Sequence, residues 1–419
     1  MKKIYLAITL ILATYYLKAQ QPGNLDLNFG ENGKIYYSNL TAYSNAVEIQ
    51  PDGKIIIGGY SNIANNSGTL ITRLNIDGSI DNEFAQSGNF ILHEIQNNKT
   101  YQAVAVKLQT DNKIVACARF VSSENSAYNV GVIRLKTNGS LDSSFGDNGV
   151  VIVDINKYDE IGNMLIQKDG KILITGNTGS SESAGNPEFL MRFLANGEKD
   201  NLFGDDGLVT TSYSSAIKVH AIVQQKDEKI LTASNYGISV QQYQVVRYNL
   251  DGKLDTDFGT NGFARLIPVE GTFQLNDMII QDDDKIVCAG GWSIIRFNLN
   301  GTPDTSFGGG DGYTLLNMPS GYADIKNVFK TVDNKILTTG HYQDGEGTGV
   351  AAILYQANGK LDSSFGVNGL AISGFDNLNQ GTDMTSGAGA IQDDGKIVIS
   401  GSFPNNEDDN YNPLAELFF

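Results

Sequence analysis

The side chains best suited to chemistry are scattered through this 419-residue chain. Its three histidines, His93, His220 and His341, lie far apart, and none has a second histidine or a glutamate at metal-binding spacing. No serine stands in the Gly-x-Ser-x-Gly turn that exposes a hydrolase nucleophile. We therefore predict no catalytic residue, and the remaining candidates are binding groups and the elements that would hold them.

An aspartate recurs within copies of the motif Leu-Asp-x-x-Phe-Gly-x-Asn-Gly. The copies are Asp26, Asp81, Asp142, Asp200, Asp255, Asp304 and Asp362. A carboxylate that returns in every copy indicates a structural role rather than many catalytic acids. A period of roughly 50 to 60 residues is typical of one supersecondary unit that is copied and stacked.

A second motif, Gln-x-Asp-Gly-Lys-Ile, keeps step with the first. It begins at Gln50, Gln109, Gln167, Gln225, Gln281, Thr331 and Gln392. Asp-Gly between two apolar runs favours a tight hairpin, because these residues accept the positive φ of the turn. A third run ends in Arg-φ-Asn and is followed by Asn-Gly or Asp-Gly, which suits a bulged three-residue turn. Each unit therefore reads as four strands, A to D.

The bulged turn sets the register between strands C and D. It places Leu74 opposite Ile80 and pairs the arginines with the aspartates. The pairs are Arg73–Asp81, Arg134–Asp142, Arg192–Asp200, Arg247–Asp255 and Arg296–Asp304. If exposed, each pair contributes about 0.2–1 kcal/mol and fixes register more than it stabilises. Leu354 takes the arginine position of the sixth unit, which leaves Asp362 without its partner. In the last unit we expect Glu416 to face Asp26.

Seven such units predict an all-β fold, a single seven-bladed β-propeller of four-stranded blades. Residues 25–37 read as a strand D without its A, B and C, and residues 388–419 read as an A, a B and a C without a D. We expect the N-terminal strand D to pair with the C-terminal strands A–C and close the ring. An open solenoid is the alternative.

The tight A–B and C–D turns must share one face of such a ring, and the variable B–C and D–A loops must share the other. Binding groups concentrate on loops held by a rigid scaffold. The fifth B–C loop shortens to four residues around Trp292, the only tryptophan, and the neighbouring units carry Tyr236, His341 and Tyr342. These four are the predicted ligand-binding residues, for a sugar or a peptide. The alternative for Trp292 is packing between blades.

A candidate metal site lies at the central channel. Strand A usually starts with alanine there, but three units carry Asn163, Asp277 and Asn327 instead. Calcium takes carboxylate and amide oxygens, and this arrangement resembles in kind the calcium site of propeller lactonases. A calcium-dependent hydrolase or lactonase using these residues is therefore the alternative to a binding protein, and Ca²⁺ is the one candidate cofactor.

Residues 1–19 have the charged start and short apolar stretch of a signal peptide, which leaves residues 20–419 as one propeller domain. The formal net charge of −17 argues against nucleic acid and anionic lipid as partners. Cys117 and Cys288 fall on distant units, so we expect no disulfide. These features predict an exported monomer, periplasmic or extracellular, with no membrane insertion after the leader is cleaved.

The combined consensus is Gln-Pro-Asp-Gly-Lys-Ile followed by Arg-φ-Asn-x-Asp-Gly-Ser-Leu-Asp-x-Ser-Phe-Gly-x-Asn-Gly. Residues 47–149 and 358–369 show it best, and with these motifs the chain resembles the delta-60 repeat family. That resemblance implies an exported bacterial β-propeller of unassigned activity. The function predicted from the sequence is a non-catalytic binding or scaffold module for a protein or glycan partner of the cell envelope.

Overall fold

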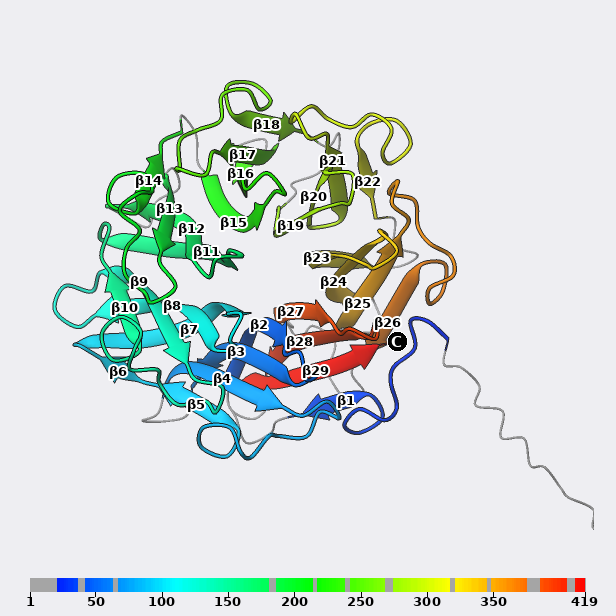
Figure 1. The fold of residues 1–419 in the computed structure, drawn as a ribbon. Helices are drawn as coiled ribbons and strands as arrows, with labels where there is room; N and C mark the ends of the chain where they lie inside the picture. The colour runs from blue at the N-terminus through cyan, green and yellow to red at the C-terminus, as the bar shows by residue number, and fades with distance from the viewer. Residues whose placement is uncertain are drawn as a thin grey trace, which may run out of the picture.

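The computed structural model describes residues 21–36, 42–62, 67–180, 186–213, 217–237, 242–267, 274–316, 321–344, 348–374, 385–404 and 411–418. The predicted leader, residues 1–19, lies outside this part. The described chain is an all-β propeller whose sheets are arranged radially about a central axis (Figure 1). No helix among the described residues is long and apolar enough to cross a membrane.

The strands form four rings about the axis. The innermost are β2 (Ala42–Ile49), β7 (Asn98–Leu108), β11 (Tyr158–Ile166), β15 (Ile217–Gln224), β19 (Asp277–Ile280), β23 (Tyr322–Lys330) and β27 (Thr385–Ile391). Next come β3 (Ile55–Ser61), β8 (Ile114–Ser122), β12 (Ile172–Gly179), β16 (Ile230–Tyr236), β20 (Ile286–Gly290), β24 (Ile336–Gln343) and β28 (Ile397–Pro404).

The third ring holds β4 (Gly68–Leu74), β9 (Tyr128–Leu135), β13 (Glu188–Phe193), β17 (Gln242–Tyr248), β21 (Ser293–Phe297), β25 (Thr348–Tyr355) and β29 (Tyr411–Phe418). The outer strands are β5 (Asn89–Leu92), β10 (Val150–Val153), β14 (Leu208–Thr211), β18 (Phe263–Leu266), β22 (Tyr313–Leu315), β26 (Leu370–Gly374) and β1 (Lys34–Tyr36), and the short β6 (Glu94–Ile95) precedes β7.

The sheet count differs from the sequence prediction. Within the described residues, backbone hydrogen bonds define six sheets, five with four strands and one with nine. In the nine-stranded sheet, β9 and β11 pair in parallel at Tyr128 and Tyr158, and Tyr128 N donates to Lys157 O at 2.9 Å. This contact joins β6–β10 to β11–β14. The prediction of a seven-bladed propeller built from separate four-stranded blades is therefore wrong.

The two described ends of the chain meet in one sheet. β1 pairs antiparallel with β29, with Lys34 opposite Glu416, and β29 pairs with β28 (Figure 1). The expected pairing of the N-terminal strand with the C-terminal strands is thus present. Beside it, Gly366 N donates to Pro22 O at 2.8 Å. Equivalent Phe-Gly amides elsewhere donate to the turn of the following unit in the same way, as Gly204 N does to Asp251 O at 2.9 Å.

The predicted C–D register is confirmed where arginine is present. Leu74 bridges Ile80, and Asp81 N donates to Arg73 O at 3.0 Å. The last unit differs from expectation. Its backbone register sets Leu417 opposite Val398, as Arg73 lies opposite Ile56, so Leu417 rather than Glu416 occupies the arginine position. The prediction that Glu416 faces Asp26 is wrong by one residue.

The arginine–aspartate pairs are buried rather than exposed. Their Nε–Oδ2 distances run from 2.6 to 2.9 Å, and the residues are 3% to 8% exposed. Each arginine also lies over the phenylalanine of its own motif, with Arg192 4.3 Å from the Phe203 ring centroid. Its Nη1 donates to a carbonyl of the next unit, as Arg192 does to Leu250 O at 2.7 Å. The network therefore links neighbouring units.

The turn lysine completes this network, a role the sequence did not suggest. Each aspartate of the motif has a lysine partner at 2.7 to 3.4 Å, and the pairs are Lys54–Asp81, Lys113–Asp142, Lys171–Asp200, Lys229–Asp255, Lys285–Asp304, Lys335–Asp362 and Lys396–Asp26. Asp362 therefore has a partner despite Leu354. The Ser364 hydroxyl and Lys335 hold the pKa of Asp362 at about 2.

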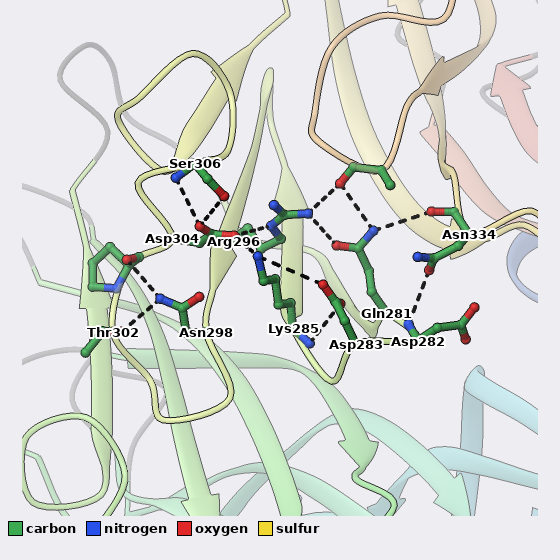
Figure 2. Close-up of polar contacts among 12 residues, drawn as sticks. Gln281, Asp282, Asp283, Lys285, Arg296, Asn298, Thr302, Asp304, Ser306 and Asn334 are labelled. Carbon is green, nitrogen blue, oxygen red and sulfur yellow. Dashed lines mark hydrogen bonds and ion pairs between the residues drawn. The ribbon is translucent and has the colours of Figure 1, made fainter.

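Figure 2 shows the network of the fifth unit. Arg296 donates to Asp304 Oδ2 at 2.7 Å and to Gln281 Oε1 at 2.8 Å, and Lys285 reaches the same Asp304 oxygen at 2.8 Å. Ser306 Oγ donates to the other oxygen, Oδ1, at 2.6 Å. Every charged group of this cluster thus has an opposite charge or a hydrogen-bond partner, as a buried charge requires.

The core lies between neighbouring sheets. Phe258 of one sheet packs with Met278, Cys288 and Ile295 of the next. Both cysteines are buried and free, and burial raises the pKa of the Cys117 thiol to about 12. Gly197 shows how closely the units approach. Its φ is +90°, and a Cβ at this position would lie 2.9 Å from the Phe145 ring, which leaves no room for a side chain.

We expect Arg247→Leu, which copies the residue at position 354, to lower the free energy of unfolding by about 2–4 kcal/mol. The reason is that Asp255 and Leu299 O lose a buried partner while the packing volume is largely kept. Urea denaturation followed by circular dichroism measures the change.

The matched control is Lys253→Ala, which removes the partner of Asp251 at a site where the lysine side chain is 82% exposed. It should change the free energy of unfolding far less than Arg247→Leu does, because solvent screens an exposed ion pair. Equal losses in the two variants would show that the buried arginine does not hold the units together.

Candidate functional site

The four predicted ligand-binding residues have different surroundings. Trp292 is 45% exposed, so it is not packed between sheets. Tyr342 is 9% exposed and donates its hydroxyl to Asp344, and Tyr236 lies under Arg265 with 4.0 Å between the guanidinium carbon and the ring centroid. His341 Nδ1 lies 4.0 Å from an oxygen of Asp324. Of these, Trp292 offers an aromatic side chain to solvent.

The three predicted metal ligands occupy equivalent positions on the inner strands β11, β19 and β23 (Figure 1). Both oxygens of Asp277 accept backbone N–H groups, from Met278 at 2.8 Å and from Val328 of the next unit at 2.9 Å. Asn163 accepts from Met164 N at 2.8 Å and donates to His220 O of the next unit at 3.2 Å. These side chains hold adjacent inner strands together.

Both oxygens of the Asp277 carboxyl are engaged by backbone amides. Burial raises the pKa of its carboxyl to about 6, against the opposing effect of the Val328 and Met278 amides. Asn327 accepts a long hydrogen bond of 3.5 Å from Thr339 Oγ1. Within the described part of the chain, no three His, Cys, Asp or Glu side chains gather in a metal-binding group.

A charged pair on the inner strands was not foreseen from the sequence. Lys107 of β7 contacts Glu48 of β2 at 2.9 Å. The charge of Glu48, with a smaller contribution from Asp277, raises the pKa of Lys107. The pair links two adjacent inner strands, as Asn163 and Asp277 do elsewhere in the ring.

Some carboxylates are buried without an ion pair among the described residues, and Glu188 is one of them. Glu188, at the start of β13, is 1% exposed and accepts a hydrogen bond from the Tyr213 hydroxyl. Burial raises its pKa to about 7, although the hydroxyls of Thr232 and Tyr213 oppose the shift. A general acid must reach a substrate, and a residue so thoroughly covered does not. Glu188 is therefore a structural, pH-sensitive group.

A row of tyrosines crosses the loop ends of β2, β3, β7, β9 and β11. The Tyr43 and Tyr60 rings lie 6.4 Å apart, and Tyr60 stacks on Tyr101 at 5.9 Å with 6° between the planes. Farther along, Tyr128 meets Tyr158 edge to face at 5.2 Å. All five are partly exposed. The row therefore runs continuously over the first three units, on the face that bears the variable loops.

Arg119 of β8 joins the two halves of this row. Its guanidinium carbon lies 5.2 Å from the Tyr101 ring centroid and 4.7 Å from that of Tyr128. Within the described residues Arg119 has no carboxylate partner, and its buried Nε has no hydrogen-bond acceptor. The repeat arginines all bind aspartates, and Arg265 donates to Gln244 Oε1 at 2.7 Å. An arginine held only by aromatic rings is unusual in a chain of net charge −17.

The tyrosine row was not predicted from the sequence, because its members come from strand ends that are spread over more than a hundred residues. The signal that could have found it is the presence of tyrosine at the loop end of several consecutive strands. The row also coincides with the Tyr128–Tyr158 bridge that merges two groups of strands into one sheet. The pairing of the strands at Tyr128 and Tyr158 thus lowers the number of separate sheets and also brings tyrosines of neighbouring units together.

The repeats match a family model described as a domain of unknown function (DUF5122) beta-propeller, over residues 50–84, 109–145, 167–203, 225–258 and 281–307. Each match begins at the turn glutamine or its equivalent and ends at the phenylalanine beneath the arginine. The matched units are the same five that carry the arginine–aspartate pair. The matches are consistent with a family of propeller repeats, and they do not establish the delta-60 name.

No curated protein matches the chain. Among solved structures, a catalytically inactive virginiamycin B lyase from Staphylococcus aureus with quinupristin is 12% identical, with 91% of this chain and 97% of that chain covered and a TM-score of 0.50. An α-L-arabinofuranosidase from Fusarium graminearum is 9% identical, with 78% and 98% covered and a TM-score of 0.49. At these identities the likeness shows the fold alone, and it gives no support to the expectation of a non-enzyme.

We expect calcium to leave the melting temperature unchanged, because the Asp277 oxygens already accept two backbone amides. An ion bound to the folded state at a hundredfold its Kd would add about 2.7 kcal/mol. Differential scanning calorimetry in 10 mM calcium and in chelator measures this. A calcium-induced rise that Asp277→Ala removes would restore the metal-site interpretation.

We expect stability to fall as pH rises from about 4.5 to about 7, because folding raises the pKa of Glu188 and its ionised form is disfavoured in the folded state. Glu188→Gln stays neutral, so its stability relative to wild type should increase by about 1–3 kcal/mol across that window. Urea titrations at pH 4.5 and pH 8 measure the difference. The exposed Glu198→Gln serves as control, and a parallel change in both variants would contradict the role assigned to Glu188.

Proposed function

We propose that this protein is an exported, non-catalytic binding propeller that recognises a protein partner of the cell envelope. The observation that carries this proposal is the tyrosine row with Arg119 at its centre, on the face with the variable loops. Tyrosine and arginine are the residue types that dominate binding energy at protein interfaces. The uniform turns cover the opposite face and hold the units together.

The stacking contacts make this surface rigid before a partner arrives. Tyr60, Tyr101 and Arg119 support one another, so little side-chain entropy is lost on binding. Tyr60 and Tyr101 each cover one ring face of the other, and Arg119 lies over Tyr101 and Tyr128, so the row offers hydroxyls, ring edges and the guanidinium for contact. That set suits a polar protein surface with an acidic group opposite Arg119 better than a sugar, which would require an open ring face.

Export is part of the same proposal. The apolar stretch and lysines of residues 1–19 support a cleavable leader, and the acidic composition supports a soluble mature chain. The partner would then be met in the periplasm or outside the cell, and no cofactor is needed for a binding role.

We expect Arg119→Ala and Tyr101→Ala each to weaken partner binding by about 2 kcal/mol, or roughly thirtyfold, while the melting temperature changes little. Residues 20–419 would be immobilised and exposed to an envelope extract. Quantitative mass spectrometry would then compare recovery by wild type and each variant, and the purified partner would be titrated against them.

The matched control is Arg265→Ala, because Arg265 also lies over a tyrosine but belongs to the fourth unit. A glycan array with the same variants tests the sugar alternative. A partner retained equally by all variants, or lost only on Trp292→Ala, would place recognition elsewhere and refute the role of the row.

A further inference from the structure

One end of the tyrosine row depends on the turn at residues 155–157, which precedes β11. β9 of the second unit and β11 of the third are neighbours in the ring, and Tyr128 N donates to Lys157 O at 2.9 Å (Figure 1). The same turn leads into Tyr158, whose ring meets the Tyr128 ring edge to face at 5.2 Å. The conformation of this turn therefore decides where both rings lie.

A buried carboxylate holds the turn. Asp159 Oδ2 accepts a hydrogen bond from Ile155 N at 2.8 Å, and Asn156 N lies 3.2 Å and 3.3 Å from the two carboxylate oxygens. Thr178 of β12 donates its hydroxyl to Oδ1 at 2.5 Å. Asp159 is 0% exposed, so water does not reach the carboxylate. Its side chain therefore ties the turn to the second strand of the third unit.

This acid is a departure from the other copies of the repeat. The strand register places Asp159 opposite Thr178, and the equivalent positions of the first, second, fourth and sixth units are Ala42, Thr100, Ile217 and Ala323. Burial raises the pKa of Asp159 to about 6 against the opposing hydrogen bonds, and the charge of Asp154 adds to the rise. A carboxyl that is costly to bury, at a position where these four units carry none, indicates a role specific to this junction.

The turn also supports the cation of the row. The Arg119 guanidinium carbon lies 4.7 Å from the centroid of the Tyr128 ring. If the turn opened, Tyr128 would lose its backbone acceptor and its contact with Tyr158, and Arg119 would lose a fixed ring beneath it. Side chains that are ordered before binding lose less entropy on binding, so disorder here would weaken recognition.

The residue equivalent to Asp159 in the second unit has a comparable role beside Tyr101. Thr100 is 3% exposed, and its hydroxyl oxygen accepts a hydrogen bond from Thr69 N of the first unit at 3.0 Å. The Thr69 hydroxyl in turn donates to Tyr101 O. On β7 as on β11, a tyrosine of the row thus stands next to a buried polar side chain that fixes its backbone.

We propose that Asp159 is a positioning residue of the tyrosine surface and holds Tyr128 and Tyr158 in the arrangement that the partner recognises. This inference rests on the function proposed for the row and adds a residue that regulates its shape. Asp159 is covered by its neighbours, so it acts through the turn and the two rings and not by touching the partner.

The first measurement needs no partner. Hydrogen–deuterium exchange with single-residue resolution follows the Tyr128 amide in residues 20–419 and in Asp159→Ala. We expect exchange to be at least tenfold faster in the variant, because Ile155 N and Asn156 N lose their acceptor and the turn opens more often. Asp159→Asn keeps one acceptor oxygen and should restore part of the protection.

The matched control is Asp277→Ala. Asp277 also accepts two backbone amides at an inner strand, but it belongs to the fifth unit. Its substitution should lower the melting temperature and leave exchange at Tyr128 unchanged. The comparison separates a local effect on the row from a general loss of stability.

The second measurement titrates the purified envelope partner against the same variants. Asp159→Ala should bind it about tenfold more weakly than wild type, with Asp159→Asn between the two. In a Tyr128→Ala background, Asp159→Ala should weaken binding less than about twofold further, because the ring through which it acts is already gone. A residue that merely stabilises the fold would not show this dependence on Tyr128.

Unchanged exchange at Tyr128 in Asp159→Ala, or an equal acceleration in Asp277→Ala, would overturn the proposal. Faster exchange with unchanged partner binding would overturn it as well, and would leave the function proposed for the row intact. If wild type captures no partner, the function proposed for the row is refuted, whereas the exchange measurement still decides whether Asp159 positions Tyr128.

Discussion

The buried contact between arginine, aspartate and lysine is the interaction on which this ring depends. A desolvated guanidinium must be neutralised and hydrogen-bonded. In five units the guanidinium binds the aspartate of its own hairpin and also donates to a carbonyl of the next unit. One side chain therefore fixes both the strand register and the contact between two units. Where leucine takes its place at 354, an apolar pocket of 700 Å³ lined by Leu354, Leu337 and Phe365 opens on the turn face. The lysine alone keeps the aspartate paired there but does not fill the junction.

This arrangement separates the two faces of the molecule. The turn face carries the repeated network, and substitutions there disturb two units at once. The B–C and D–A loops of the other face differ from unit to unit. The tyrosine row lies on that face, where Tyr128 and Tyr158 also join the strands of two units by a parallel bridge. Rigidity at this edge of the ring therefore comes from the same residues that present the aromatic surface.

The parts of the fold that follow from local turn chemistry could be predicted from the sequence. The Asn-Gly and Asp-Gly turns determine the register, so Leu74–Ile80 and Arg73–Asp81 were predicted correctly. The wrong predictions concern contacts between segments that lie far apart in the sequence. The buried Arg73 donates to Thr137 O of the next unit, and Lys54, which pairs with Asp81, comes from a different turn. The predicted register of the last unit was wrong by one residue at Glu416, because no arginine identifies the register of that strand. The Tyr128–Tyr158 bridge and the tyrosine row arise from backbone approach between units, which no local motif encodes.

The proposed tyrosine surface arises where one copy departs from the hydrogen-bonding pattern of the repeat. The repeat arginines pair with aspartates, whereas Arg119 lies over two tyrosine rings and its buried Nε has no hydrogen-bond partner among the described residues. In a repeat protein a departure of this kind costs stability at one junction without disturbing the others, because each unit contacts chiefly its neighbours. The surrounding network can therefore tolerate an unsatisfied group, and that group keeps its full hydrogen-bonding capacity for a ligand. Differences between copies, rather than the residues they share, are thus the physical guide to function in this fold.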